Sequence, residues 1–206
     1  MAKNPFMHYV PDFEKEAEDF LRKYECADAI DTPRPIPIRD IATRLMSLDI
    51  VDTEYLSFDG SVQGAIAFTR GIIDVYDWST EQNIGYEVYH PTIFVDADIL
   101  NLGRANNTLA HECFHWRHRN YFNFKRTHEN GAEFAFRCNN RISQFGSLLG
   151  GEWSNEDKME WQAKTIAPKI LMPRNAFRSK VDATYRQLTG DNKNICKRAV
   201  TSTVLD

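Results

Sequence analysis

A His-Glu-x-x-His pattern constrains this chain more than any other sequence feature. His111 and His115 are four residues apart inside the apolar, helix-compatible run 108–115. On an α-helix, residues i and i+4 lie on one face about one turn apart, so both imidazoles can direct a nitrogen at a single metal ion. Glu112 is expected to point into the cleft beside a water molecule without binding the ion. The pattern therefore predicts a helix that carries two metal ligands and the catalytic carboxylate of a zinc hydrolase.

The composition is typical of an ordinary soluble globular protein. The chain has 206 residues, of which 42% are hydrophobic and 26% are charged, enough to bury a sizeable core. Its net charge of -4 and its pI near 5.9 disfavour direct nucleic-acid binding as the main activity. No stretch is apolar enough for a signal peptide or a membrane span, and the four scattered cysteines suit reduced thiols. We therefore expect a cytoplasmic protein with no membrane partner.

The first part of the chain predicts a helix followed by an extended linker. Apolar residues recur every three or four positions over residues 11–25. Three alternating prolines make residues 32–37 extended, because proline is incompatible with a helix interior. We accordingly divide the chain into an N-terminal segment, residues 1–35, and one main domain, residues 36–206. A second amphipathic helix is predicted over 38–48, where scattered arginines and the lack of a glycine turn disfavour a helix-turn-helix motif.

Between residues 50 and 98 the hydrophobic period changes from that of helices to that of strands. Short runs rich in β-branched and aromatic residues occur at 64–69, 72–76 and 92–96, separated by turn residues. They predict a small sheet of three or four strands in front of the His-Glu-x-x-His helix. Because the connection to that helix is short, we expect the last strand to lie beside it. An exposed strand there can hold a peptide substrate extended by β-augmentation.

Residues 102–122 are predicted to form the helix that carries the pattern, with Leu102 and Trp116 among its buried residues. Arginines and aromatic residues mix over 117–126. This stretch is typical of a nucleic-acid patch or, as we favour, of the solvated end of a helix, whose dipole attracts cations. An extended motif would place a third histidine at position 121, which is a tyrosine, so His118 is not assigned as a ligand.

Residues 123–153 lack a regular pattern, and we predict that they form an insertion that covers the cleft. Alternation over 133–137 indicates a strand, and the glycines between 146 and 151 indicate a loop.

The third metal ligand is expected from the helix that follows. Asn155 is a candidate cap for this helix, on which Glu160, Ala163 and Ala167 share one face. Small residues on that face let the helix approach the first one closely, with Glu160 at the approach. The alternative is that Glu160 is an ordinary exposed carboxylate, as most helix glutamates are. A last helix is predicted over 177–188.

Two motifs together resemble the ImmA/IrrE family of zinc-dependent metallopeptidases. The first is Thr108-Leu109-Ala110-His111-Glu112-x-x-His115, and the second is Glu160-x-x-Ala163-x-x-Ile166-Ala167-x-x-Ile170-Leu171-Met172-Pro173. The resemblance covers about residues 36–188. It departs from the family pattern at Cys113-Phe114, where Leu-Gly is usual, and at Lys164, where Asn or Asp is usual.

The resemblance implies an α+β, zincin-like fold of the gluzincin type. In such a fold, a small and mostly antiparallel sheet packs on the His-Glu-x-x-His helix and on a second helix that bears a glutamate. One Zn2+ per chain would be held by His111, His115 and Glu160, with Glu112 as general base of an endopeptidase. The implied substrate is a protein, a helix-turn-helix repressor or antitoxin, whose cleavage relieves repression on a mobile element or in a stress response.

Two other functions fit the same residues. One is a non-catalytic zinc-fold regulator that binds and sequesters a repressor, and the other is a hydrolase of small amides, which the resemblance disfavours. An enzyme would also need a donor that stabilises an oxyanion. The candidates are Tyr89, His90, Tyr121 and Arg141, which the sequence does not rank.

Overall fold

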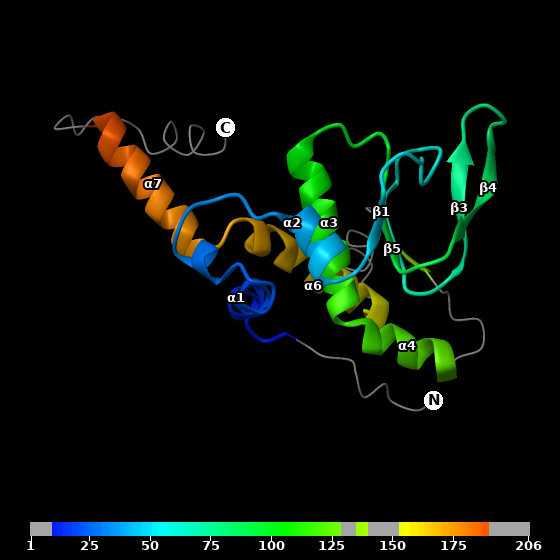
Figure 1. The fold of residues 1–206 in the computed structure, drawn as a ribbon, viewed down its shortest axis with the longest axis horizontal. Coiled ribbons are helices and arrows are strands. Elements are labelled where there is room, and N and C mark those ends of the chain that lie inside the picture. The colour runs from blue at the N-terminus through cyan, green and yellow to red at the C-terminus, as the bar shows by residue number, and fades with distance from the viewer. Residues whose placement is uncertain (1–9, 129–134, 140–152, 190–206) are drawn as a thin grey trace.

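The computed structural model of the protein describes residues 10–128, 135–139 and 153–189. Within these ranges, the chain is a mixture of helices and short strands, drawn in Figure 1. The helices are α1 (Phe13–Lys23), the 3-10 turn η1 (Ala27–Ile30), α2 (Ile38–Asp40), the π-helical turn η2 (Ile41–Leu45), α3 (Leu102–Arg117), α4 (Arg119–His128), α6 (Asn155–Leu171) and α7 (Arg174–Thr189). The strands are β1 (Asp49–Val51), β2 (Val62–Ala67), β3 (Gly71–Asp77), β4 (Gln82–Val88), β5 (Thr92–Val95) and β6 (Ala135–Asn139).

The elements form three layers, which confirms a mixed α+β architecture with a small sheet. Four strands pair in the order β1-β5-β2-β6, with β1 parallel to β5 and β2 antiparallel to both of its neighbours. One face of this sheet packs against the helices, chiefly α3. The other face is covered by the hairpin β3–β4, which is a separate two-stranded sheet (Figure 1). The sheet therefore separates a helical core from a smaller core under the hairpin.

The helical core depends on close packing between α3 and α6. The two helices pack against each other, and Ala110 on α3 and Ala163 and Ala167 on α6 are fully buried in this core. Small side chains at such a contact allow two helix axes to approach closely. Larger apolar residues of both helices, among them Leu109, Phe114, Ile166 and Ile170, fill the core around them. No described helix is long and apolar enough to cross a membrane.

Helix α1 belongs to the same core as α3 and α6. Its N-cap Asp12 accepts hydrogen bonds from two backbone N–H groups of the first turn, which satisfies donors that would otherwise lack partners. Leu21 is fully buried in the helical core. Just before the helix, the Val10 N–H donates to Gln162 Oε1 on α6 at 2.7 Å, and Glu16 pairs with Arg117 on α3 at 2.8 Å. Residues of the predicted N-terminal segment are thus built into the helical layer.

The helix predicted over 102–122 is in fact two helices. α3 ends at Arg117, and α4 starts at Arg119 after His118 leaves the helical conformation. No proline or glycine causes this break. Tyr121 and Phe122, which follow the break, are both buried. The change of direction at His118 therefore keeps these two aromatic residues in the core. The expected burial of Leu102 is also wrong, because this first residue of α3 is 74% exposed.

The predicted strands were found with shifts of one or two residues at their ends, and the strands β1 and β4 were missed. The runs 64–69, 72–76 and 92–96 correspond to β2, β3 and β5, and the run 133–137 corresponds to β6. β4 was missed although Ile84, Tyr86 and Val88 alternate with polar residues and a glycine, and most of its residues are solvent-exposed. The remainder of the predicted insertion, residues 129–134 and 140–152, lies outside the described residues, so the cover over the cleft stays a prediction.

Two helix boundaries also differ from the sequence prediction. The helix predicted over 38–48 ends at Leu45, which is exposed. Helix α6 is capped by Ser154 rather than by Asn155, in a capping box with Asp157.

Neither strand that packs against α3 has an unpaired edge. β5 lies between β1 and β2, and β2 lies between β5 and β6. The last strand before α3 does lie beside it, as predicted, but it cannot accept an additional strand. Among the described strands of this sheet, only β1 and β6 have an edge that a peptide could extend.

Because Leu21 is fully buried against α6 and α3, we expect Leu21→Ala to lower the free energy of unfolding by about 2–4 kcal/mol. Urea unfolding should still give a single transition. The exposed Leu100 provides the control, and Leu100→Ala should change stability by less than about 0.5 kcal/mol. A second, independent transition in either variant would contradict the shared core.

Candidate metal centre

Helix α3 brings the two predicted histidines to one side. The helix starts at the cap Asn101, whose side chain accepts from the Arg104 N–H, and every residue from Thr108 to His115 is buried. The Nε2 atoms of His111 and His115 lie 2.9 Å apart. The imidazole rings converge as the four-residue spacing predicted.

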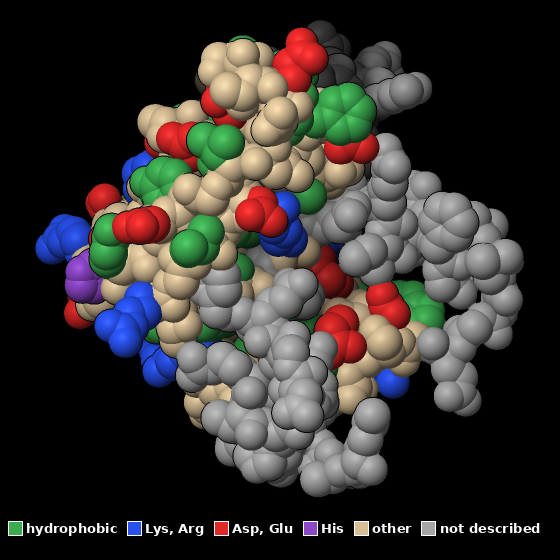
Figure 2. All heavy atoms as spheres, turned by 90° about the vertical axis from the view of Figure 1, so that its right-hand side faces the viewer, with side chains coloured by type: hydrophobic (Ala, Val, Ile, Leu, Met, Phe, Trp, Pro, Cys, Tyr) green, Lys and Arg blue, Asp and Glu red, His purple; other side chains and the backbone are tan. Residues whose placement is uncertain are grey.

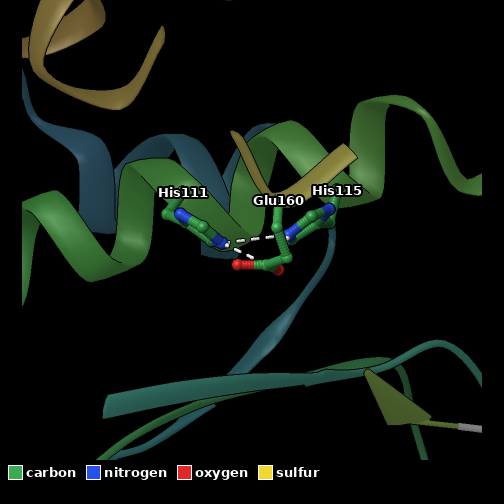
Figure 3. Close-up of side chains that lie close together, drawn as sticks. All are labelled: His111, His115 and Glu160. Carbon is green, nitrogen blue, oxygen red and sulfur yellow. Dashed lines mark hydrogen bonds and ion pairs between the residues drawn. The ribbon is translucent and has the colours of Figure 1, made fainter. Parts of the chain in front are cut away.

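Helix α6 supplies the third group. Glu160 is buried, and its Oε1 lies 2.9 Å from His115 Nε2 and 3.4 Å from His111 Nε2. Figure 3 shows the two rings and the carboxylate turned toward one another. These three side chains form a group whose ligand atoms all lie within 4.8 Å of one another. Glu160 is therefore not an ordinary exposed helix carboxylate, and this buried group could hold a metal ion.

The protonation states of these groups suit metal binding. Burial lowers the pKa of His115 to about 4, and the hydrogen bond to Glu160 offsets only part of this effect, so the imidazole is neutral at pH 7. Burial alone would raise the pKa of Glu160, but hydrogen bonds from His111 and His115 outweigh it and hold the pKa well below its usual range. Metal ligands must be deprotonated, and His115 and Glu160 are so at neutral pH.

Lys164 adds a positive charge next to this carboxylate. Its Nζ lies 3.8 Å from Glu160 Oε2, one turn further along α6. The lysine that departs from the family pattern is therefore close to the predicted ligand.

Glu112 lies against the same group but makes no contact that would stabilise its charge. Its side chain is 0% exposed, and neither carboxylate oxygen accepts a hydrogen bond from any described residue. Burial, with a further contribution from the negative charge of Glu160, raises the pKa of Glu112 well above its usual value. A carboxyl group with a raised pKa next to a potential metal site is a candidate general base.

Gly64 on β2 lies close to Glu112. An added Cβ at this position would lie 2.8 Å from Glu112 Oε1 and 2.5 Å from Thr108 Cγ2. No side chain larger than hydrogen fits there unless one of these groups moves. The sequence prediction missed both Gly64 and Thr108 as parts of the site. The only available signal was a glycine inside a strand, which often marks a close approach of another group.

None of the other described candidates from the sequence belongs to this group. His118 Nε2 is 3.5 Å from Glu16 on α1, consistent with its exclusion as a ligand. Tyr89 and His90 are exposed, and the Tyr121 hydroxyl donates to Glu156 Oε1 at 2.9 Å. Arg141 lies outside the described residues. Cys113 is fully buried, and burial raises the pKa of its thiol, so it packs as a small apolar residue.

Comparisons of the chain with protein-family models, with curated proteins and with solved structures gave no match. The two motifs and the geometry of the buried group therefore carry the functional argument.

Because an added methyl group on Gly64 would collide with Thr108 and Glu112, Gly64→Ala should lower the free energy of unfolding by about 1–3 kcal/mol. The double variant Gly64→Ala/Thr108→Ser should recover part of this loss, since serine lacks Cγ2. Gly85→Ala is the matched control, because its Cβ would meet only Ile72, which is exposed and can turn away. Equal urea stability of the Gly64 and Gly85 variants would contradict this assignment.

The buried Glu112 should also destabilise the metal-free protein. At pH 7 the unfolded chain carries an ionised Glu112, whereas the raised pKa in the folded state makes this charge unfavourable. In the presence of a chelator, Glu112→Gln should therefore raise the free energy of unfolding at pH 7 by about 1–2 kcal/mol. The gain should shrink as the pH falls through the ordinary glutamate pKa of about 4.3, and it should vanish well below this pH, where Glu112 is protonated in both states. The change Glu25→Gln at an exposed position should show neither effect, and a less stable Glu112→Gln protein would contradict this expectation.

Proposed function

We propose that this chain is a zinc-dependent endopeptidase. The observation that carries the proposal is the buried convergence of His111, His115 and Glu160, with the carboxylate of Glu112 on the same helix. Chance occurrence of the short motif on a surface helix would not place a glutamate from residue 160 within 2.9 Å of a motif histidine. Two imidazoles and one carboxylate are a donor set of catalytic zinc sites.

The distances between the donor atoms fit such an ion. Ligands about 2.0–2.2 Å from a tetrahedral zinc ion lie about 3.3–3.6 Å from one another. The separations in the structure, 2.9, 2.9 and 3.4 Å, need only small adjustments of the side chains. When bound, zinc would polarise the peptide carbonyl and lower the pKa of a water molecule.

Glu112 would move the proton in this mechanism. It takes a proton from the attacking water and later delivers it to the nitrogen of the leaving amine. A raised pKa makes the carboxylate a stronger base than an exposed glutamate. Its contact with β2 through Gly64 limits the positions that the carboxylate can adopt.

The substrate class comes from the family resemblance. In this proposal, the chain cleaves a helix-turn-helix repressor or antitoxin in the cytoplasm and thereby relieves repression. A substrate held as an extended strand would pair at the edge of β6, which is next to the strand that contacts Glu112. A peptide-inhibitor complex without strand pairing at this edge would exclude this mode of binding.

A non-catalytic regulator is the second candidate, and the burial of the whole group favours it. All four groups, His111, Glu112, His115 and Glu160, are at most 3% exposed. A site that stays closed would hold the ion as a structural element while another surface binds the repressor. The product discriminates the two functions, since an enzyme yields a shortened repressor and a regulator leaves it intact in a stable complex.

We expect the purified protein to bind one zinc ion per chain and to cleave the repressor encoded beside its gene, with cleavage blocked by a chelator. Glu112→Gln should retain zinc and lower the cleavage rate by about 100-fold or more, because the proton acceptor is lost. His115→Ala should lose both zinc and activity. Zinc content is measured by elemental analysis and cleavage by gel electrophoresis, with Glu18→Gln as the control. Full cleavage by the Glu112→Gln protein would refute the mechanism.

A further inference from the structure

The hairpin layer exposes apolar side chains on the opposite side of the sheet from the metal centre. Of the ten large hydrophobic residues that are exposed in the described part of the chain, five lie between residues 58 and 89. Phe58 is 66% and Trp78 is 51% exposed. The others in this stretch are Ile72, Ile84 and Tyr89.

Four aromatic rings at the end of this layer form a connected cluster. Tyr76 is the central ring, with its centroid 5.0 Å from that of Trp78 and 6.0 Å from that of Phe58, while Tyr55 packs edge-on against Trp78 at 5.9 Å. The Tyr76 N–H donates to the Tyr55 carbonyl at 2.7 Å, which ties the β1–β2 connection to the hairpin. Asp77 accepts from Ser79 and Thr80 and orders the turn that presents Trp78. The rings are therefore held in place, and aromatic anchors that are ordered in advance favour protein binding.

The same layer concentrates negative charge. Residues 52–89 contain seven of the 29 acidic residues of the chain but only one of its 25 Lys and Arg residues, Arg70. Asp74, Glu81 and Glu87 are exposed on the hairpin. Figure 2 looks at this side of the molecule and shows acidic and hydrophobic side chains interleaved over its upper part. The net charge of -4 is therefore unevenly distributed, with an acidic field on this layer.

A groove of about 480 Å³ runs between the hairpin and the β1–β2 connection. Phe58 and Tyr76 provide apolar walls, and the acidic residues Asp59 and Glu81 also line it. Arg137 also lines the groove, and its guanidinium donates to the Asp74 carbonyl. Aromatic faces next to carboxylates suit the side chains of lysine and arginine, which have an apolar stem and a cationic end.

We propose that this hairpin surface docks a basic, amphipathic segment of a partner protein. The surface is formed by Tyr55, Phe58, Ile72, Asp74, Tyr76, Trp78, Glu81, Ile84 and Glu87. Charge complementarity selects this partner, because the acidic field attracts Lys and Arg and repels nucleic acids and anionic membranes. The apolar residues of the segment would contact the aromatic cluster.

This surface also suggests how a substrate is recognised. The DNA-binding face of a helix-turn-helix protein carries Lys and Arg that neutralise phosphates, so it has the required chemistry. Docking on the hairpin would hold the repressor on the face of the sheet opposite to the metal centre. A flexible part of the repressor would then reach the metal centre around the edge of β6. This step rests on the proposed function, whereas the docking itself does not.

The docking is tested with three dye-labelled peptides of about 18 residues, a length that spans several helical turns. The first has lysines and leucines at helical spacing, the second has glutamates in place of the lysines, and the third has the lysines but no leucines. Fluorescence anisotropy with the Glu112→Gln protein should show binding of the first peptide only, weakened by added salt. Equal affinity for the second or the third peptide would overturn the proposal.

Variants locate the binding on the protein. Phe58→Ala/Trp78→Ala and Asp74→Lys/Glu81→Lys should each weaken binding about tenfold. The matched controls Leu188→Ala and Asp182→Lys, on exposed positions of α7, should bind as the parent protein does. The side chains substituted on the hairpin and on α7 are all exposed, whereas Glu112, which is changed in the parent protein, is buried. Thermal unfolding verifies that each variant is folded. Unchanged affinity in both hairpin variants would overturn the proposal.

Kinetics with the repressor separate this inference from the proposed function. If the repressor is cleaved, the hairpin variants should raise KM without changing kcat, and an unchanged KM would refute substrate docking while leaving the peptidase intact. If the repressor is not cleaved but the peptides bind as described, the peptidase proposal fails and the docking surface stands.

Discussion

The burial of the Glu160 carboxylate between two packed helices is the interaction on which the rest of the structure depends. Removing a carboxylate from water costs several kcal/mol unless partners compensate for the lost solvent. Here the partners are the imidazoles of His111 and His115, at 3.4 and 2.9 Å. Small, fully buried residues such as Ala110 and Ala163 suit the close approach of α3 and α6 that brings these imidazoles to the carboxylate. Helix α1 and the sheet then enclose this pair of helices.

The second carboxylate of the site is held differently. Glu112 is as deeply buried as Glu160, yet no described residue donates a hydrogen bond to it. Proteins keep such unfavourable groups mainly where function requires them, and the surrounding core supplies the compensating stability. Because Gly64 has no side chain, β2 can pass directly over this carboxylate. The sheet therefore forms part of the environment of Glu112.

The sheet gives the molecule two faces with different chemistry. On one face, helices surround a buried group of nitrogen and oxygen ligands. On the other, the hairpin carries ordered aromatic rings among acidic side chains. Because the two sites contact opposite faces, substitutions in one should leave the other intact. The proposed docking surface and the proposed metal site can then be tested separately within one small protein.

The local pattern of the sequence by itself determined the convergence of His111 and His115 on one face of α3, and it predicted the place of Glu160 beside them. The spacing of His111 and His115 translates directly into positions on one helix face, and the face of α6 marked by Ala163 and Ala167 predicted the close approach. The expected small sheet was also found. Only the tertiary structure decided which strands have free edges, where the chain turns at His118, that Gly64 contacts Glu112, and that the hairpin forms a separate layer. Periodicity shows which side of an element is apolar, but the element that covers this side is selected by packing between residues far apart in the sequence.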